Sequence, residues 1–312
     1  MEWINASLGE DFILIGFSNW PGLEMALLGV VPTFYFLALV GNLVIILVSL
    51  VDPHLQTPMY LFLSHLSFLD LCLTTSITPM MLANLHHRDQ VITHRGCIAQ
   101  LYTSLALGCT ECAILAVMAY DRYLAVCQPL RYVVLMPTRL GHLLTAASWS
   151  AGFSVSLAQT TLMLQVPLCG HRWLDHFFCE LPVILQLACC DARWAEAQMF
   201  VARVIILVIP TSLILVSYGC VARAVLRVRS VAGRHRAFGT CGSHLTVVSL
   251  FFGPAICVYL QPTYSSSQEQ GKFVSLFYTV VTPLLNPLTY TLRNKEVKEA
   301  MRRLLGRGQK GA

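Results

Sequence analysis

Charged residues are scarce in this 312-residue sequence: 12% of the residues are Asp, Glu, Lys or Arg, and 56% are hydrophobic. A soluble globular domain carries roughly 25% charged residues, so the composition argues against a soluble enzyme or binding domain. The net charge of +5 does not indicate a nucleic-acid partner, because the basic residues lie in short segments beside apolar stretches. This composition is typical of a protein embedded in membrane lipid.

Motifs that mark other membrane protein classes are also missing. No HExxH, GxSxG or P-loop sequence occurs, which argues against a membrane enzyme, and we expect no organic cofactor. Internal repeats and matching Gly/Pro-interrupted segments are lacking, which argues against a transporter or channel. Glu2, Glu10 and Asp11 stand where a cleavable signal peptide would be basic and then apolar, so we expect the first apolar stretch to direct insertion.

Seven apolar stretches are long enough to cross a bilayer as helices, since a hydrocarbon core of roughly 30 Å takes about 20 apolar residues. Continuous runs of this kind favour helices over the alternating strands of a membrane barrel. The stretches cover residues 23–50, 58–84, 97–127, 140–165, 197–226, 239–260 and 272–292. We therefore predict an all-α integral membrane protein, a seven-transmembrane helix bundle over residues 23–292.

The distribution of basic residues predicts the orientation of this bundle. Of the 21 Lys and Arg residues, 15 fall on one side of the membrane and six on the other. By the positive-inside rule, residues 1–22 are extracellular and residues 293–312 are cytoplasmic in a plasma-membrane protein. The sequon Asn5-Ala6-Ser7 agrees with glycosylation of an outside N-terminus, although such tripeptides also arise by chance.

The segment after the last stretch has two unlike faces. Val297, Met301 and Leu304 share one side of a helix over residues 294–305, and Lys298 and Arg302 share another. This pattern predicts a short amphipathic helix on the inner membrane surface, with a solvated basic tail as the alternative.

Five of the 12 cysteines fall at the predicted outer surface. Cys97 opens the third stretch, and Cys169, Cys179, Cys189 and Cys190 lie in the long connection before the fifth. An oxidising compartment favours disulfides there, and a zinc site is the second alternative because paired CxxC spacing is lacking. The other seven cysteines lie in or beside apolar stretches, where we expect packing roles.

Seven short motifs follow one another at the expected stretches. They are Gly41-Asn42, PMY at Pro58–Tyr60, LSFLD ending at Asp70, MAYDRYLAVC at Met118–Cys127, Ser217-Tyr218, RAFGTCGSH at Arg236–His244 and PLLNPLTY at Pro283–Tyr290. Together they resemble the odorant-receptor branch of the rhodopsin-like G-protein-coupled receptors over nearly the whole chain. The resemblance implies a receptor, not an enzyme, whose partners are a small volatile odorant, membrane lipid and a stimulatory, olfactory-type G protein that raises cyclic AMP.

The resemblance also implies an inner coupling site. A guanidinium at Arg122 can pair with Asp121 at rest and turn toward the G protein in the active state, with an interface-snorkelling arginine as the alternative. The residues expected to serve coupling are Asp121, Arg122, Tyr123, Tyr218, Arg236 and Tyr290.

An outer ligand pocket is expected on the same helix face as Arg122. Ser104 lies 18 residues earlier, which is five helical turns or roughly 27 Å. The pocket candidates, each with plain helix packing as the alternative, are Ser104, Leu105, Gly108, Cys109, Cys112, Arg203, Ile206, Phe252, Tyr259 and Thr279. Residues 273–292 contain no lysine for a retinal Schiff base, and Ser104 stands where an aminergic receptor has aspartate. We therefore expect a neutral or weakly polar ligand.

Three charged residues within the stretches have two interpretations each. Arg203 either snorkels outward or points inward as an anchor for a carbonyl or carboxylate. Asp70 and Glu111 are expected to face the bundle interior. By resemblance, Asp70 forms with Asn42 and Asn286 a polar core that can hold a sodium ion, to which Glu111 adds a second carboxylate. The alternative is a hydrogen-bond network with one carboxylate protonated.

For the outer cysteines, the family pattern implies the pairs Cys97–Cys179 and Cys169–Cys189. Because Cys190 adjoins Cys189, the partner of Cys169 stays ambiguous.

Overall fold

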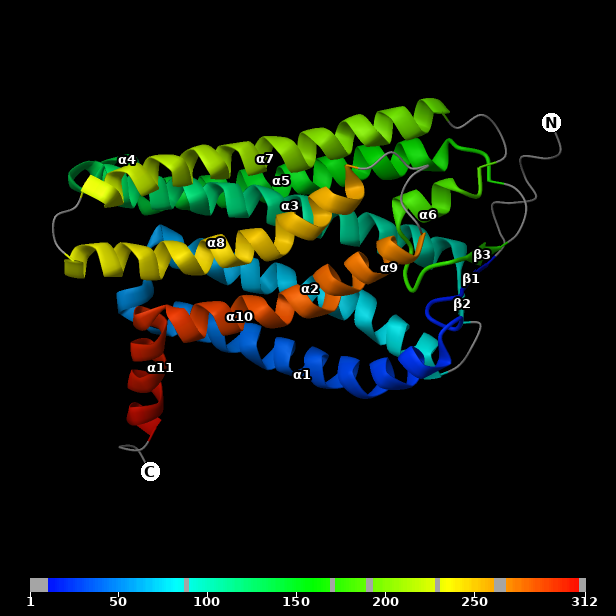
Figure 1. Ribbon diagram of the computed structural model, residues 1–312, viewed down its shortest axis with the longest axis horizontal. Helices are drawn as coiled ribbons and strands as arrows, with labels where there is room; N and C mark the ends of the chain where they lie inside the picture. The colour runs from blue at the N-terminus through cyan, green and yellow to red at the C-terminus, as the bar shows by residue number, and fades with distance from the viewer. Residues whose placement is uncertain are drawn as a thin grey trace.

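The computed structural model describes residues 11–86, 90–168, 172–188, 193–227, 231–260 and 268–308. Its long helices run side by side in an elongated bundle, with β1 and α11 at opposite ends (Figure 1). Four helices in this part of the chain are long and apolar enough to cross a membrane: α1 (Pro21–Val51), α2 (Pro58–His86), α3 (His94–Cys127) and α7 (Arg193–Arg227).

The three remaining apolar stretches are helical too. They form α5 (Thr138–Leu164), α8 (Val231–Tyr259) and a composite helix of α9 (Gln268–Leu276), the π-helical segment η4 (Phe277–Val281) and α10 (Thr282–Arg293). The connections contain η2 (Pro53–Leu55), η3 (Pro129–Arg131), α4 (Tyr132–Leu135) and α6 (Leu181–Leu185). Neither the π-helical segment nor α6 was expected from the sequence.

Helix α3 lies within the bundle and packs against α2, α5 and α7. Its approach to α5 requires a glycine, because a Cβ on Gly152 would lie 2.1 Å from Thr110 Oγ1 and 2.8 Å from the Ala106 carbonyl oxygen. Helices α1 and α10 meet in a similar way, since a Cβ on Gly41 would lie 2.9 Å from Pro287 Cγ. These contacts hold two helix pairs at short distance.

A small sheet, which the sequence did not predict, joins three distant segments at one end of the bundle (Figure 1). Strand β1 (Phe12–Leu14) pairs antiparallel with β2 (Gln90–Ile92) and parallel with β3 (Trp173–Leu174). The Asn84 amide donates to the Leu14 carbonyl oxygen at 2.6 Å, which attaches the sheet to α2. Residues 12–14 are therefore part of the packed structure.

Helix α11 (Lys295–Gly308) lies across the other end of the bundle, at a steep angle to the long helices (Figure 1). Val297 and Ala300 are buried, whereas Lys298 and Arg302 are exposed. The residues that followed a helical pattern in the sequence thus form a helix with one buried face.

Candidate functional site

A cavity of about 170 Å³ opens among α3, α5, α7, α8 and the outer connections. Its wall is mainly apolar. The residues on the wall are Leu73, Leu101, Ser104, Leu105, Gly108, Cys109, Cys112, Gln159, Phe178, Glu180, Leu181, Pro182, Met199, Ala202, Arg203, Ile206, Leu207, Phe251, Ala255 and Tyr278. A cavity of roughly 150 Å³ already accommodates a benzene-sized guest, so this space suits a small organic molecule.

Seven of the ten pocket residues expected from the sequence lie on this wall. They are Ser104, Leu105, Gly108, Cys109, Cys112, Arg203 and Ile206. A Cβ on Gly108 would meet no atom within 4 Å, so this position leaves open space in the wall. Arg203 lies on the wall, which is the geometry that an inward-facing anchor requires.

The other three expected pocket residues have different placements. Phe251 lines the cavity, while Phe252 is 2% exposed and packs in the apolar core. Tyr278 lines the cavity, while the buried Thr279 hydroxyl donates to the Ser275 carbonyl oxygen at 2.7 Å. The side chain of Tyr259 lies outside the described residues.

Tyr278 lines the cavity in place of Thr279 because η4 is π-helical. A π-helical turn takes in one more residue than an α-helical turn. Counted outward from Asn286, Tyr278 therefore occupies the face that Thr279 would occupy in a regular helix. Phe251 and Phe252 are neighbours on α8, and neighbouring helical residues point about 100° apart. Phe251 therefore faces the cavity while Phe252 points into the core.

The connection between α5 and α7 forms the roof of the cavity and was not assigned to the pocket from the sequence. The disulfide Cys97–Cys179, as the family pattern implied, ties this connection to α3, and the Cys179 N–H donates to Gln100 Oε1 at 2.9 Å. Glu180, next in the chain, accepts hydrogen bonds from Ser275 Oγ at 3.1 Å and the Tyr278 hydroxyl at 3.3 Å. The expected Cys169–Cys189 pair and the Asn5 sequon lie outside the described residues.

His176 is a buried, neutral residue of this roof. Its ring lies 4.7 Å from the ring of Phe177 and 4.8 Å from that of Phe178. Burial, and next the positive charge of Lys272, lower the pKa of His176 to about 3. The approach of its Nε2 to Glu180 Oε2 at 3.5 Å is therefore not an ion pair at neutral pH.

The polar core lies inward of the cavity. The Asn286 amide donates to Asp70 Oδ2 at 2.9 Å and Oδ1 at 3.2 Å, and the Asn42 amide donates to the Pro283 carbonyl oxygen at 2.8 Å. Glu111 interacts electrostatically with Asp70. Within the described chain, three buried oxygens in this region accept no hydrogen bond: Asn42 Oδ1, Glu111 Oε1 and Asn286 Oδ1.

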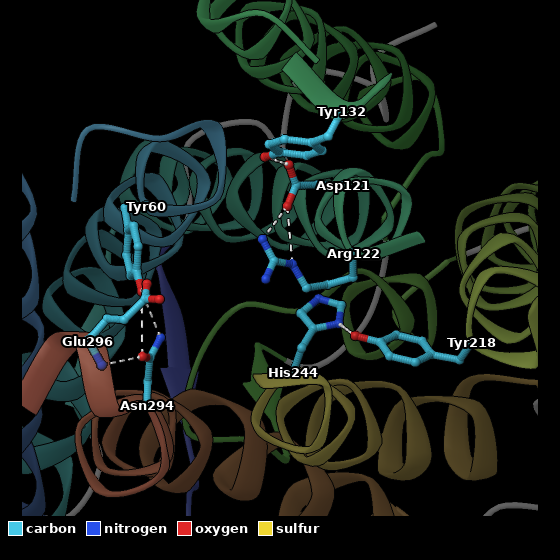
Figure 2. A network of polar contacts seen from close by, with 8 residues as sticks. All are labelled: Tyr60, Asp121, Arg122, Tyr132, Tyr218, His244, Asn294 and Glu296. Atoms are coloured by element: carbon cyan, nitrogen blue, oxygen red, sulfur yellow. Dashed lines mark hydrogen bonds and ion pairs between the residues drawn. The ribbon is translucent and has the colours of Figure 1, made fainter. Parts of the chain in front are cut away.

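The C-terminal end of α3 carries a closed charge pair. Arg122 donates to Asp121 Oδ2 from Nη2 at 2.6 Å and from Nε at 3.1 Å, and the Tyr132 hydroxyl donates to Asp121 Oδ1 at 2.7 Å (Figure 2). Asp121 is fully buried and the Arg122 side chain is 14% exposed. Burial and the charge of Asp121 raise the pKa of Tyr132, so its hydroxyl stays a proton donor.

The other expected coupling residues have separate placements. The Tyr218 hydroxyl and His244 Nδ1 lie 2.6 Å apart and join α7 to α8 (Figure 2). Tyr290 is buried, and its hydroxyl forms no hydrogen bond within the described chain. The ring of Tyr123 stacks on that of Tyr120 at 6.3 Å, and the side chain of Arg236 lies outside the described residues.

A second cluster attaches α11 to the bundle. The Tyr60 hydroxyl donates to Glu296 Oε2 at 2.6 Å, and the Asn294 amide donates to Tyr60 at 3.1 Å (Figure 2). Arg303 donates to Asp52 Oδ2 from Nε at 2.9 Å. These contacts were not expected from the sequence.

Comparisons with known proteins identify the family. A family model described as olfactory receptor matches residues 31–308. Three human relatives are Olfactory receptor 2Y1 (58% identical, 99% of each chain covered), Olfactory receptor 2G3 (57%, covering 96% of this chain and 97% of the relative) and Olfactory receptor 2G6 (54%, covering 98% and 96%). The chain belongs to the olfactory receptor family of G-protein-coupled receptors, which are multi-pass membrane proteins and not enzymes. The resemblance noted in the sequence is confirmed.

Proposed function

We propose that this chain is an odorant receptor that crosses the plasma membrane seven times, with its N-terminus outside and its C-terminus in the cytoplasm. A small organic ligand binds in the cavity beneath the roof, and the surface around Arg122 activates a stimulatory, olfactory-type G protein, which raises cyclic AMP. The single observation that carries this proposal is that one helix, α3, contributes Ser104 to the cavity and Arg122 to the inner charge pair. Cavity and coupling surface are thus joined by a continuous rigid element.

The closed Asp121–Arg122 pair and the Tyr218–His244 contact describe the resting receptor in this proposal. Ligand binding favours an arrangement in which α8 moves away from α7, and the guanidinium of Arg122 then becomes available to the G protein. Tyr218 and Tyr290 would supply hydroxyls to that open state. The buried Tyr290 hydroxyl, which has no acceptor in the described chain, supports such a change of partner.

The polar core is a proposed site for a sodium ion. Carboxylate and amide oxygens are hard ligands, and the unpartnered oxygens of Asn42, Glu111 and Asn286 fit this demand together with Asp70. The described residues contain no group of three or more His, Cys, Asp or Glu suited to a metal, so amide oxygens would have to complete the shell. A hydrogen-bond network with one protonated carboxylate remains the alternative, and sodium dependence of ligand affinity would separate the two.

A cyclic-AMP screen with chemically diverse odorants tests the receptor function. The expected result is a ligand-dependent rise in cells that carry the wild type and none with Arg122→Ala at equal surface density. A parallel ion-flux measurement should show no ligand-gated current. A ligand-gated current without a rise in cyclic AMP would show that the chain is a channel and not a receptor.

Labelling of terminal tags tests the topology. An N-terminal tag should be stained on intact cells, and a C-terminal tag should require permeabilisation. Both tags on the same side would contradict seven crossings.

A further inference from the structure

One polar atom of a cavity-wall residue has no hydrogen-bond partner in the described chain. Gln159 of α5 lies on the wall, is 6% exposed, and its Oε1 forms no hydrogen bond within the described chain. A buried acceptor without a partner is unfavourable, and a ligand that supplies a donor removes that cost. The oxygen has less than 1 Å² of accessible surface, so a guest reaches it after rotation of the terminal amide, which is a soft torsion. The orphaned oxygen therefore indicates the chemistry of the guest.

A second wall residue, Ser104, presents an acceptor. The Ser104 hydroxyl donates to the Leu101 carbonyl oxygen at 3.2 Å, which leaves its oxygen lone pairs for a guest. Glu180 does carry acceptors, but besides the hydroxyls of Ser275 and Tyr278 it interacts with another group of the protein. The Tyr278 hydroxyl has its proton engaged in its contact with Glu180. Arg203 does carry donors, but it already interacts with another group of the protein.

We infer that the ligand is a small neutral molecule with a single hydroxyl on an apolar body, an alcohol or phenol, whose O–H donates to Gln159 Oε1. This inference rests on the proposed receptor function and names its ligand class. Methyl ethers and esters of the same skeleton lack the donor, so they leave the Gln159 oxygen unpaired. A protonated amine would donate as well, but it would bury a charge in a mainly apolar cavity that also holds Arg203.

The experiment is a cyclic-AMP dose response with two matched series. One series is hexanol, hexyl methyl ether, hexanal, hexanoic acid and hexylamine; the other carries the same groups on a benzyl skeleton. For the wild type, the alcohols are expected to be about tenfold more potent than their ethers, which is the effect of one good hydrogen bond. Gln159→Leu is expected to abolish this ratio, and Gln159→Glu, which keeps an acceptor, is expected to retain it.

Gln165→Leu is the matched control, because Gln165 lies at the exposed end of the same helix. It should keep the wild-type ratio, and cell-surface staining should show equal amounts of all variants. Because each ratio is measured within one variant, a change in expression does not alter it. Ser104→Ala is a second test variant, and a reduced alcohol-to-ether ratio is expected from it.

Three results would overturn the inference. Acids, aldehydes or amines could be more potent than the alcohols; the alcohol-to-ether potency ratio could be unchanged in Gln159→Leu; or neither series could raise cyclic AMP. Ligand-independent signalling of Asp121→Asn separates these failures from a failure of the receptor function. If that variant raises cyclic AMP while the alcohols do nothing, the hydroxyl assignment fails and the receptor function stands.

Discussion

Lys272 and Asp175 form an ion pair with Nζ and Oδ1 2.5 Å apart, which joins the start of α9 to the roof of the cavity. The same ammonium donates to the Gly16 carbonyl oxygen at 3.1 Å and lies 5.6 Å from the centre of the Trp20 ring. One cation thus holds three segments that are far apart in the sequence. Its side chain is 1% exposed, whereas that of Asp175 is 28% exposed.

This difference in exposure predicts unequal effects of removing either partner. Asp175→Ala leaves a buried ammonium without its counter-ion and should destabilise the receptor by about 3 kcal/mol. Lys272→Met removes the buried charge and leaves a carboxylate that water can reach, so it should cost less. Thermal unfolding of the detergent-purified variants measures both effects, and a larger loss for Lys272→Met would refute the argument.

Acidification should loosen the roof through His176. Its pKa of about 3 in the folded protein lies below the ordinary value of 6.5, so the unfolded state binds more protons between these values. Stability from the neutral ring is therefore complete above pH 6.5 and declines as pH falls, by at most about 1.4 kcal/mol per pH unit. His176→Phe keeps an aromatic ring without the titration, and its unfolding temperature should fall less steeply with acid. Parallel pH profiles of the two proteins would contradict this assignment.

Asp121→Asn should raise ligand-independent cyclic AMP. The substitution weakens a charge-assisted contact worth roughly 1.5–3 kcal/mol, which shifts a two-state equilibrium about tenfold or more toward the open state. Tyr132→Phe removes one neutral donor and should give a smaller rise. Tyr120→Phe, on an exposed ring of the same helix, serves as the control. Basal signalling equal to the wild type in Asp121→Asn would show that the pair does not hold the resting state.

Filling the open space at Gly108 should exclude ligand. Gly108→Leu adds a side chain at the cavity wall, and overpacking of about 1–3 kcal/mol lowers potency roughly tenfold or more. Gly219→Leu is matched, because a Cβ there also meets no atom within 4 Å and Gly219 is exposed away from the cavity. Dose-response curves at equal surface density give the comparison; equal potency in both variants would place the ligand elsewhere.

The contact between α11 and the first inner connection should support coupling. The backbone N–H of His54 and then the guanidinium of Arg303 hold the pKa of Asp52 below its usual value, so the carboxylate is ionised at neutral pH. Arg303→Ala should release α11 and lower the maximal cyclic-AMP response without changing ligand potency. The neighbouring Arg302→Ala removes an exposed arginine and should act like the wild type. A loss shared equally by both variants would indicate a general effect of basic charge.

The long helices and the inner charge pair were predictable because their determinants are local. Continuous apolar runs specify helices whatever their partners are, and Asp121 adjoins Arg122 in the chain. The cavity face of α3 followed from helical spacing, so Ser104, Gly108 and Cys112 were found together. Each of these features depends on residues within a few turns of one another.

The roof and the sheet depend on contacts between distant segments and were missed. Three residues, Phe12–Leu14, form a strand because β2 and β3 approach them from positions about 80 and 160 residues away. Glu180 could have been suspected, since it follows Cys179 of the expected disulfide. Nothing in the sequence singled out Gln159 as a pocket residue, because a single amide in an apolar helix is common.

The extra residue in η4 shifts the helical register of α9 by one residue relative to that of α10. The outer half can present a new side chain to odorant when one residue is gained or lost there, while Asn286 and Tyr290 keep their places below. A π-helical segment at this position would allow related receptors to differ in the odorants they bind while their G-protein coupling residues stay in place.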